Sequence, residues 1–240
     1  MADYLFADNY RLEEGPTRDF LRVFMKGLVH KHNNTLGVIQ GFSTLILYED
    51  DLAESVRENA QQMNDTARES NALNQILLTA SGCCNFEIKP TALSSMLPYF
   101  AEKVKAMCEQ KGVTITGNDA SGLPDFPADS AKLGEMLMAL LTNAAEAAAE
   151  TDAKTVSFEM YPPGEQSQNG TVDLFIRNSS PDWSQEKIVE YLKPFETSRT
   201  NDHFGLGLTM AAVLAGEMGI RMGIKNENGQ TDVWLAIPTS

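Results

Sequence analysis

The chain has 240 residues, of which 42% are hydrophobic and 22% charged, a composition that supplies a buried core and excludes an intrinsically disordered chain. Acidic residues outnumber basic ones by 33 to 19, which gives a formal net charge of -14. Such a surface repels phosphate backbones and anionic lipids, so we expect neither nucleic-acid nor membrane binding. The three cysteines match no disulfide or metal-ligand spacing and no secretory signal is visible, so we expect a cytoplasmic protein.

Two long helical patterns fill the first third of the chain. The first begins at Pro16, a residue suited to a first helical turn, and runs to about Tyr48 with apolar residues at three- and four-residue steps. After the acidic residues 49–51, a second such pattern runs to about Thr79. Two helices of this length with a short connection predict an antiparallel hairpin. Its uncovered apolar stripe predicts a homodimer, in which two hairpins pair into a four-helix bundle.

From Asn85 onward, short apolar runs alternate with helical patterns. Strands are expected at 86–88, 113–116, 155–160, 172–176, 222–225 and 233–237, and helices at 93–111, 130–150, 184–192 and 208–218. Turn residues at 164–170 and 227–230 indicate hairpin turns. The predicted fold class is therefore α+β, with a helical hairpin over residues 1–82 followed by an α/β sandwich over residues 83–240, in which helices cover one sheet.

Polar residues interrupt the first helix. His30, Asn33, Asn34 and Gly37 lie three and four residues apart and so share one helical face. This face presents a nucleophilic imidazole to a partner or to a second domain. A single helical histidine is, by itself, more often a solvated or core residue.

Two further groups lie in the second region. Asn143 and Glu146 share a face of the helix at 130–150 among small alanines, where they either orient Mg²⁺ around phosphates or belong to a packing face. The segment 194–208 places Gly205 and Gly207 at the entrance of an apolar helix, where backbone N–H groups and the helix dipole favour anions. Residues 197–203 read as a mobile lid, and we assign no role to His203.

Taken in order, these groups resemble the catalytic core of two-component sensor histidine kinases over about residues 18–238. The resemblance implies a dimerisation hairpin and a GHKL-type, Bergerat-like ATP-binding domain, with ATP and Mg²⁺ as ligands and response-regulator receiver domains as partners. It implies that His30 is the phosphoacceptor of an H-box, with Asn34 available to orient a water or a phosphoryl oxygen. The other implied site residues are Asn143, associated with Mg²⁺, together with Glu146, Asn178, Phe195, Thr197, Gly205 and Gly207 in the nucleotide motifs.

Several positions depart from the pattern of that family. Lys31 stands where the family usually has an acidic general base, a group worth about 10² to 10⁴ in rate. Asn178 stands in the position of the aspartate that reads the adenine amino group, and Ser180 and Asp182 replace the glycines that follow it. Trp183 adds volume beside them. Ala139 and His203 depart in the second and third motifs.

These departures fall on the steps that need ATP, whereas an exposed imidazole needs only access to a receiver. The leading interpretation is therefore a phosphotransfer protein that passes phosphoryl groups between His30 and receiver aspartates, with an impaired ATP-binding domain. The alternatives are an active soluble ATP-dependent histidine kinase, in which Asn178 replaces the missing aspartate, and a non-catalytic pseudokinase scaffold.

Overall fold

The computed structural model describes residues 4–7, 13–118, 122–166, 170–197 and 204–239. The chain divides into two compact units. One is the helical segment Leu12–Cys84, and the other combines Asn85–Ser240 with the N-terminal residues Met1–Arg11. The two units are described separately below.

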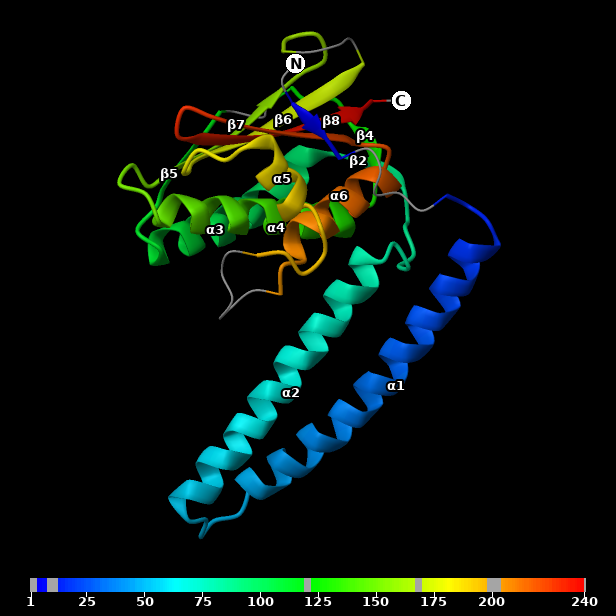
Figure 1. The fold of residues 1–240 in the computed structure, drawn as a ribbon, viewed down its shortest axis with the longest axis vertical. Helices are drawn as coiled ribbons and strands as arrows, with labels where there is room; N and C mark the ends of the chain where they lie inside the picture. The colour runs from blue at the N-terminus through cyan, green and yellow to red at the C-terminus, as the bar shows by residue number, and fades with distance from the viewer. Residues whose placement is uncertain (1–3, 8–12, 119–121, 167–169, 198–203, 240) are drawn as a thin grey trace. The chain divides into compact units, whose positions relative to one another are not determined.

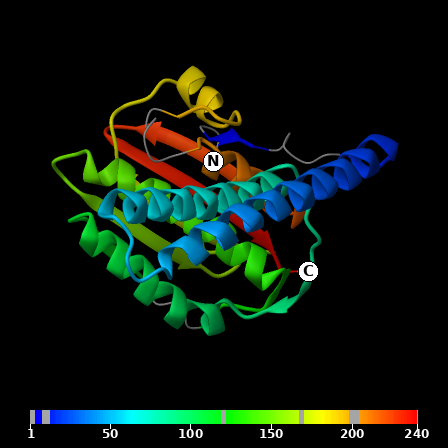
Figure 2. The same cartoon turned by 90° about the horizontal axis from the view of Figure 1, so that it is seen from below.

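The helical unit is a hairpin of two long helices. Helix α1 (Pro16–Leu47) begins with the proline in its first turn, and helix α2 (Glu54–Ala80) follows after a short connection. The helices run antiparallel and side by side in both views (Figures 1 and 2), which confirms the predicted hairpin. Among the described residues, neither these helices nor any other combine the length and apolar character needed to cross a membrane.

Polar pairs are interspersed with small apolar contacts between the two helices. The Asn64 amide donates to the Thr44 hydroxyl at 2.9 Å, and the Asn71 amide donates to the Gln40 side-chain oxygen at 3.2 Å. Many large apolar side chains of α1 remain exposed instead: Phe20, Val23, Phe24, Leu28, Val38, Phe42 and Leu45. The hairpin therefore holds its register partly through directional hydrogen bonds and leaves an apolar surface uncovered.

The second unit contains a six-stranded sheet with the order β1-β7-β8-β6-β5-β3. Its strands are β1 (Leu5–Phe6), β3 (Thr114–Gly117), β5 (Thr155–Tyr161), β6 (Thr171–Ser179), β7 (Arg221–Glu227) and β8 (Gln230–Pro238). Neighbouring strands are antiparallel except β3 and β5, which are parallel. The tight turn between β7 and β8 has positive φ at Asn228 and Gly229 and confirms the turn predicted there. Part of the other predicted turn, residues 167–169, lies outside the described residues.

The N-terminal end of this unit differs from the sequence-based expectation in two ways. Strand β1 belongs to the sheet, although residues 1–82 were all expected in the hairpin region. The strand expected at 86–88 is absent there; instead β2 (Lys89–Thr91) pairs with β4 (Phe126–Ala128), which had no prediction. Two- and three-residue strands take their stability from distant partners, so their own sequence carries almost no periodic signal.

Helices cover one face of the sheet. Helices α3 (Leu93–Gln110), α4 (Ser130–Ala149) and α6 (Gly207–Glu217) lie on the same side of the strands (Figure 1). The short helix α5 (Gln185–Tyr191) contributes Ile188 to the same core. Alternate residues of the central strands, such as Leu174, Ile176 and Leu235, point into this core and are almost fully buried. The covered sheet is the α/β sandwich expected from the alternating pattern.

On the opposite face of the sheet, aromatic residues at and just before β1 pack on Trp234. The ring of Trp234 contacts those of Tyr4 and Phe6 at centroid distances of 5.8 and 6.0 Å. The Tyr4 hydroxyl donates to Asp232 Oδ2 at 2.5 Å, and the same carboxylate accepts from Arg177 Nε at 3.2 Å. Burial, together with the hydrogen bond to Asp232, raises the pKa of Tyr4 well above its usual range. Strand β1 is therefore an integral part of the sheet.

Gly223 makes room for this strand, because a Cβ there would lie 3.1 Å from Tyr4 Cβ and 3.3 Å from Phe6 Cε1. We predict that Gly223→Val lowers the free energy of unfolding by about 1 to 3 kcal/mol through this overpacking. The measurement is urea unfolding followed by tryptophan fluorescence. In a chain lacking residues 1–7 the same substitution should cost nothing, because valine suits a strand better than glycine does. An equal loss in both backgrounds would contradict this assignment.

Candidate functional site

His30 lies on α1 with its imidazole exposed to solvent, and Asn34 is exposed one turn further along the helix. Lys31 is also exposed. The structure therefore places the predicted phosphoacceptor on an accessible helical surface, where an imidazole nitrogen can be reached from solution.

A buried asparagine of α2 anchors the helical segment that carries His30. Asn74 is 3% exposed, its amide nitrogen donates to Asn33 Oδ1 at 2.6 Å, and its oxygen lies 3.0 Å from His32 Nδ1. Because the Asn74 oxygen can only accept, His32 Nδ1 carries the hydrogen. This network holds α1 against α2 next to His30. Sequence reasoning missed Asn74, whose only signal was a polar residue within the apolar stripe of α2.

Asn143 lies on α4 next to the start of α6. Helix α4 begins after Asp129, whose carboxylate accepts from the backbone N–H groups of Ala131 and Lys132 at 3.1 Å, an N-cap that fixes the start of the helix. A Cβ at Gly207 would lie 3.3 Å from Asn143 Nδ2 and 3.5 Å from its Oδ1. The structure thus brings together two residues that the sequence placed in separate motifs.

Glu146 has a different neighbour. Its carboxylate is 9% exposed and accepts from Lys111 Nζ at 3.3 Å, at the end of α3. Asn143 and Glu146 are three residues apart on α4, but one adjoins α6 and the other pairs with a lysine after α3. An ion pair with lysine occupies part of the coordination capacity that a carboxylate needs for Mg²⁺. The two residues predicted to orient Mg²⁺ therefore have different neighbours: Asn143 adjoins Gly207, and Glu146 pairs with Lys111.

The segment before α6 closes on itself at Phe195 and Gly205. The Phe195 N–H donates to the Gly205 carbonyl at 2.8 Å, and both residues have positive φ, of 67° and 64° respectively. Thr197 is half-buried. Residues 198–203, which contain most of the predicted lid and His203, lie outside the described residues. Gly207 is the first residue of α6, and the Thr209 hydroxyl donates to the Leu192 carbonyl at 2.8 Å, which fixes the first turn of that helix.

Asn178 lies near the end of β6, on the face covered by the helices. Its side chain is 5% exposed, and its amide nitrogen donates to the backbone carbonyl of Ser179 at 2.8 Å. The chain then passes through 180–184 to α5, where the ring of Trp183 contacts that of Tyr191 at 5.1 Å. The residue expected to recognise adenine is therefore buried, and its amide nitrogen already donates to the backbone of the next residue.

Residues 128–240 match the model of the family described as histidine kinase-, DNA gyrase B- and HSP90-like ATPases. The full-length histidine kinase ShkA, solved in complex with AMPPNP, superposes with a TM-score of 0.75 over 90% of this chain and 46% of its own, at 20% sequence identity. Residues 128–240 therefore carry a GHKL-type domain, and the chain has the fold of two-component histidine kinase catalytic cores. This core combines a helical hairpin with a GHKL-type domain, as the sequence motifs predicted.

Other histidine kinases are similar to this chain in sequence or in fold. The cell-division control histidine kinase PdhS of Brucella suis is 23% identical over 232 residues, which cover 88% of this chain and 22% of PdhS. PdhS of Brucella abortus matches equally. The histidine kinase ThkA, solved in complex with the response regulator TrrA, has a TM-score of 0.58 at 17% identity and covers 90% of this chain and 61% of its own. The chain therefore spans about a fifth of the length of the curated relatives it matches.

The positive φ of Gly205 suggests a sharp test of the closed segment before α6. A Cβ at Gly205 would lie 2.6 Å from the Phe195 carbonyl carbon, whereas Gly112, with φ of 66°, has nothing within 4 Å of such an atom. We predict that Gly112→Ala costs about 1 kcal/mol for the left-handed backbone alone. Gly205→Ala should cost at least about 1 to 2 kcal/mol more because of the added clash, as measured by urea unfolding. Equal costs would contradict the close approach.

Proposed function

We propose that this histidine kinase core acts as a histidine phosphotransferase. It accepts a phosphoryl group on His30 from the aspartyl phosphate of one receiver domain and passes it to the aspartate of another. In this proposal the kinase-like domain binds ATP poorly, because its nucleotide site is impaired. The observation that carries the proposal is the exposed imidazole of His30 on α1, followed by the cationic Lys31 instead of an acidic residue.

The transfer needs little from this chain beyond position and access. The unprotonated imidazole nitrogen of His30 attacks the phosphorus of the receiver acyl phosphate, a P–N bond forms, and the P–O bond to the receiver carboxylate breaks. The reverse reaction returns the group to a second receiver. Asn34 lies one turn away, where its amide can donate to a phosphoryl oxygen. Lys31 adds a positive charge near the phosphoryl group. Neither step requires a base at position 31.

The nucleotide site fits ATP at one end only. Gly205 and Gly207 lie at the start of α6, where backbone N–H groups suit phosphate oxygens, and Asn143 adjoins Gly207. Asn143 would there hold Mg²⁺, and bound ATP would supply a phosphoryl group. At the other end, Asn178 is buried and replaces the carboxylate expected to read adenine. A charge-assisted hydrogen bond is about twice as strong as a neutral one, so this replacement weakens adenine recognition.

The retained phosphate end favours a second candidate function, an active ATP-dependent histidine kinase. ShkA, of similar fold, was solved with AMPPNP. In that case ATP and Mg²⁺ alone would label His30 without any donor protein. The two candidates differ in the source of the phosphoryl group and agree on His30 as its acceptor.

A homodimer forms part of the proposal. The exposed apolar side chains of α1 form two groups, from Phe20 to Leu28 and from Val38 to Leu45, on either side of the polar stretch that contains His30. A second hairpin offers the same apolar surface, so two copies bury it in a four-helix bundle. The opposing face of α2, around Gln62, carries polar and charged residues. The apolar surface of α1 therefore marks the dimer contact.

We expect His30 to be the histidine that accepts the phosphoryl group. A receiver domain labelled with ³²P from acetyl phosphate should label this chain within minutes, whereas [γ-³²P]ATP with Mg²⁺ should not. His30→Gln should abolish labelling, a loss of more than about 100-fold, and His32→Gln, on the same helix, should retain it. ATP-dependent labelling of His30 would establish the kinase candidate instead. Absence of labelling from several phosphorylated receivers would leave only a scaffold function.

Charges placed in the apolar surface of α1 should separate the dimer. Burying one phenylalanine is worth about 1.5 to 3 kcal/mol, so Phe24→Glu with Phe42→Glu should raise the dimer dissociation constant by more than about 100-fold. Sedimentation equilibrium measures this change. Gln62→Glu adds one negative charge on the polar face of α2 and should leave the dimer intact. A dimer that survives the double substitution would place the contact elsewhere.

A further inference from the structure

Three polar side chains form a row across neighbouring strands next to the expected adenine position. Asn178 of β6 pairs in register with Thr231 of β8, and Thr231 pairs with Asn226 of β7. All three follow the alternation that turns Ile176, Val233 and Ile224 toward the core. The row therefore lies on the helix-covered face, at one end of the three central strands.

Ser180, which follows β6, contacts two residues of this row. Its hydroxyl lies 2.8 Å from the Thr231 hydroxyl, and the Asn226 amide donates to both of these oxygens at 2.9 Å. Ser180 and Thr231 are 4% and 6% exposed. A glycine at position 180 would carry no hydroxyl and would leave Thr231 available for another partner. The serine thus takes up hydrogen-bonding capacity that the site would otherwise offer to a ligand.

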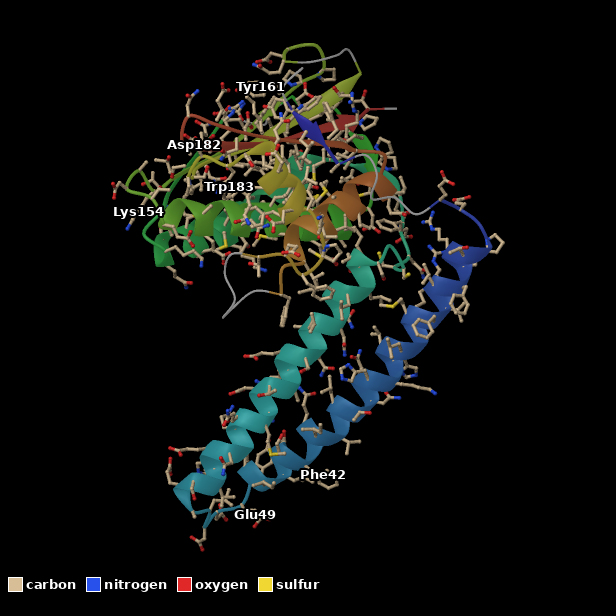
Figure 3. All side chains as sticks on the ribbon, viewed as in Figure 1. Phe42, Glu49, Lys154, Tyr161, Asp182 and Trp183 are labelled. Carbon is tan, nitrogen blue, oxygen red and sulfur yellow. The ribbon has the colours of Figure 1, made fainter. Side chains whose placement is uncertain are left out.

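Residues 180–183, which follow β6, are hydrogen-bonded to Asn226 of β7 and to Gly229 in the β7–β8 turn. Asn226 Oδ1 accepts from the Trp183 N–H at 2.5 Å, and its amide also donates to the Pro181 carbonyl at 3.1 Å. Asp182 Oδ1 accepts from the Gly229 N–H at 2.6 Å, and the Ser180 N–H donates to the Gly229 carbonyl at 2.9 Å. Asp182 and Trp183 are labelled in this segment in Figure 3. The side chains of Asp182 and Ser180 therefore both make hydrogen bonds at positions where a glycine would have no side chain.

We infer that Ser180 and Asn226 close the adenine end of the nucleotide site, so that this domain excludes purine nucleotides while keeping its fold. The inference rests on the proposed phosphotransferase function and names the residues responsible for its impaired nucleotide site. A purine entering beside Asn178 has to break the contacts of Ser180 with Thr231 and Asn226 and displace the packed Trp183. Each buried polar group released in this way must find a new partner on the ligand.

The test measures binding of a fluorescent nucleotide, mant-ADP, with Mg²⁺. The variant Ser180→Gly/Asp182→Gly/Asn226→Ala removes the closure. Asn118→Ala is the matched control, because the Asn118 amide makes a similar staple to the backbone of Met160 at 2.7 and 2.8 Å, on another strand. We expect no saturable binding by the wild-type chain or by the control. The triple variant should bind saturably, with a dissociation constant at least about tenfold below the highest mant-ADP concentration at which the wild-type chain shows no saturation.

Saturable binding of mant-ADP by the wild-type chain would overturn the closure. Failure of both wild type and a folded triple variant to bind would overturn the role of these residues. Transfer from a labelled receiver to His30, measured on the same preparations, reports separately on the proposed function. If the triple variant does not fold, hydrogen exchange of the wild-type chain decides the matter: the Trp183 and Gly229 amides should exchange as slowly as those of β8, and fast exchange would overturn the inference.

Discussion

The close approach of α4 to the sheet and to α6 determines where the proposed nucleotide site lies. Small buried residues of α4, among them Ala144, Ala145 and Ala148, allow neighbouring elements to pack tightly against that helix. The same close packing brings Asn143 against Gly207, where any side chain at position 207 would meet the asparagine. Larger residues on this face of α4 would separate these two positions. The alanine-rich surface is therefore a packing face, and it also positions the two residues of the proposed phosphate end.

The sequence predicted the long elements well because their periodic patterns reflect burial along a single face. Pro16 and the apolar stripe of α1 are local signals, and α1 begins where they place it. Strands β1, β2 and β4 were missed or misplaced because their pairing partners lie far away in the chain. Likewise, Asn226 makes four hydrogen-bonding contacts and Asn74 makes two. Nothing near either residue in the sequence indicates these contacts. Single polar residues have no period, so only the structure identifies them.

The order of the site residues followed from the resemblance to histidine kinases, but their neighbours did not. Asn143 was expected with Glu146, yet it adjoins Gly207 while Glu146 pairs with Lys111. A shared helical face specifies which residues can meet a common ligand, but not which side chains from other elements reach them first. Lys111 follows α3 and lies 35 positions away in the chain, so the helical pattern of α4 contains no information about it.

The substitutions in the adenine motif are consistent with one another. A pocket that normally satisfies its polar groups through a ligand must satisfy them internally when that ligand is lost, because a buried unpaired donor or acceptor costs about 1 to 3 kcal/mol. Ser180 supplies a partner to Thr231, Asp182 accepts from Gly229, and Asn226 joins both sides. Random loss of nucleotide binding would instead leave unpaired groups or voids at these positions. The mutual satisfaction of these side chains is what a domain maintained for its fold requires, and it agrees with the proposed phosphotransfer through His30, which needs no nucleotide site in this chain.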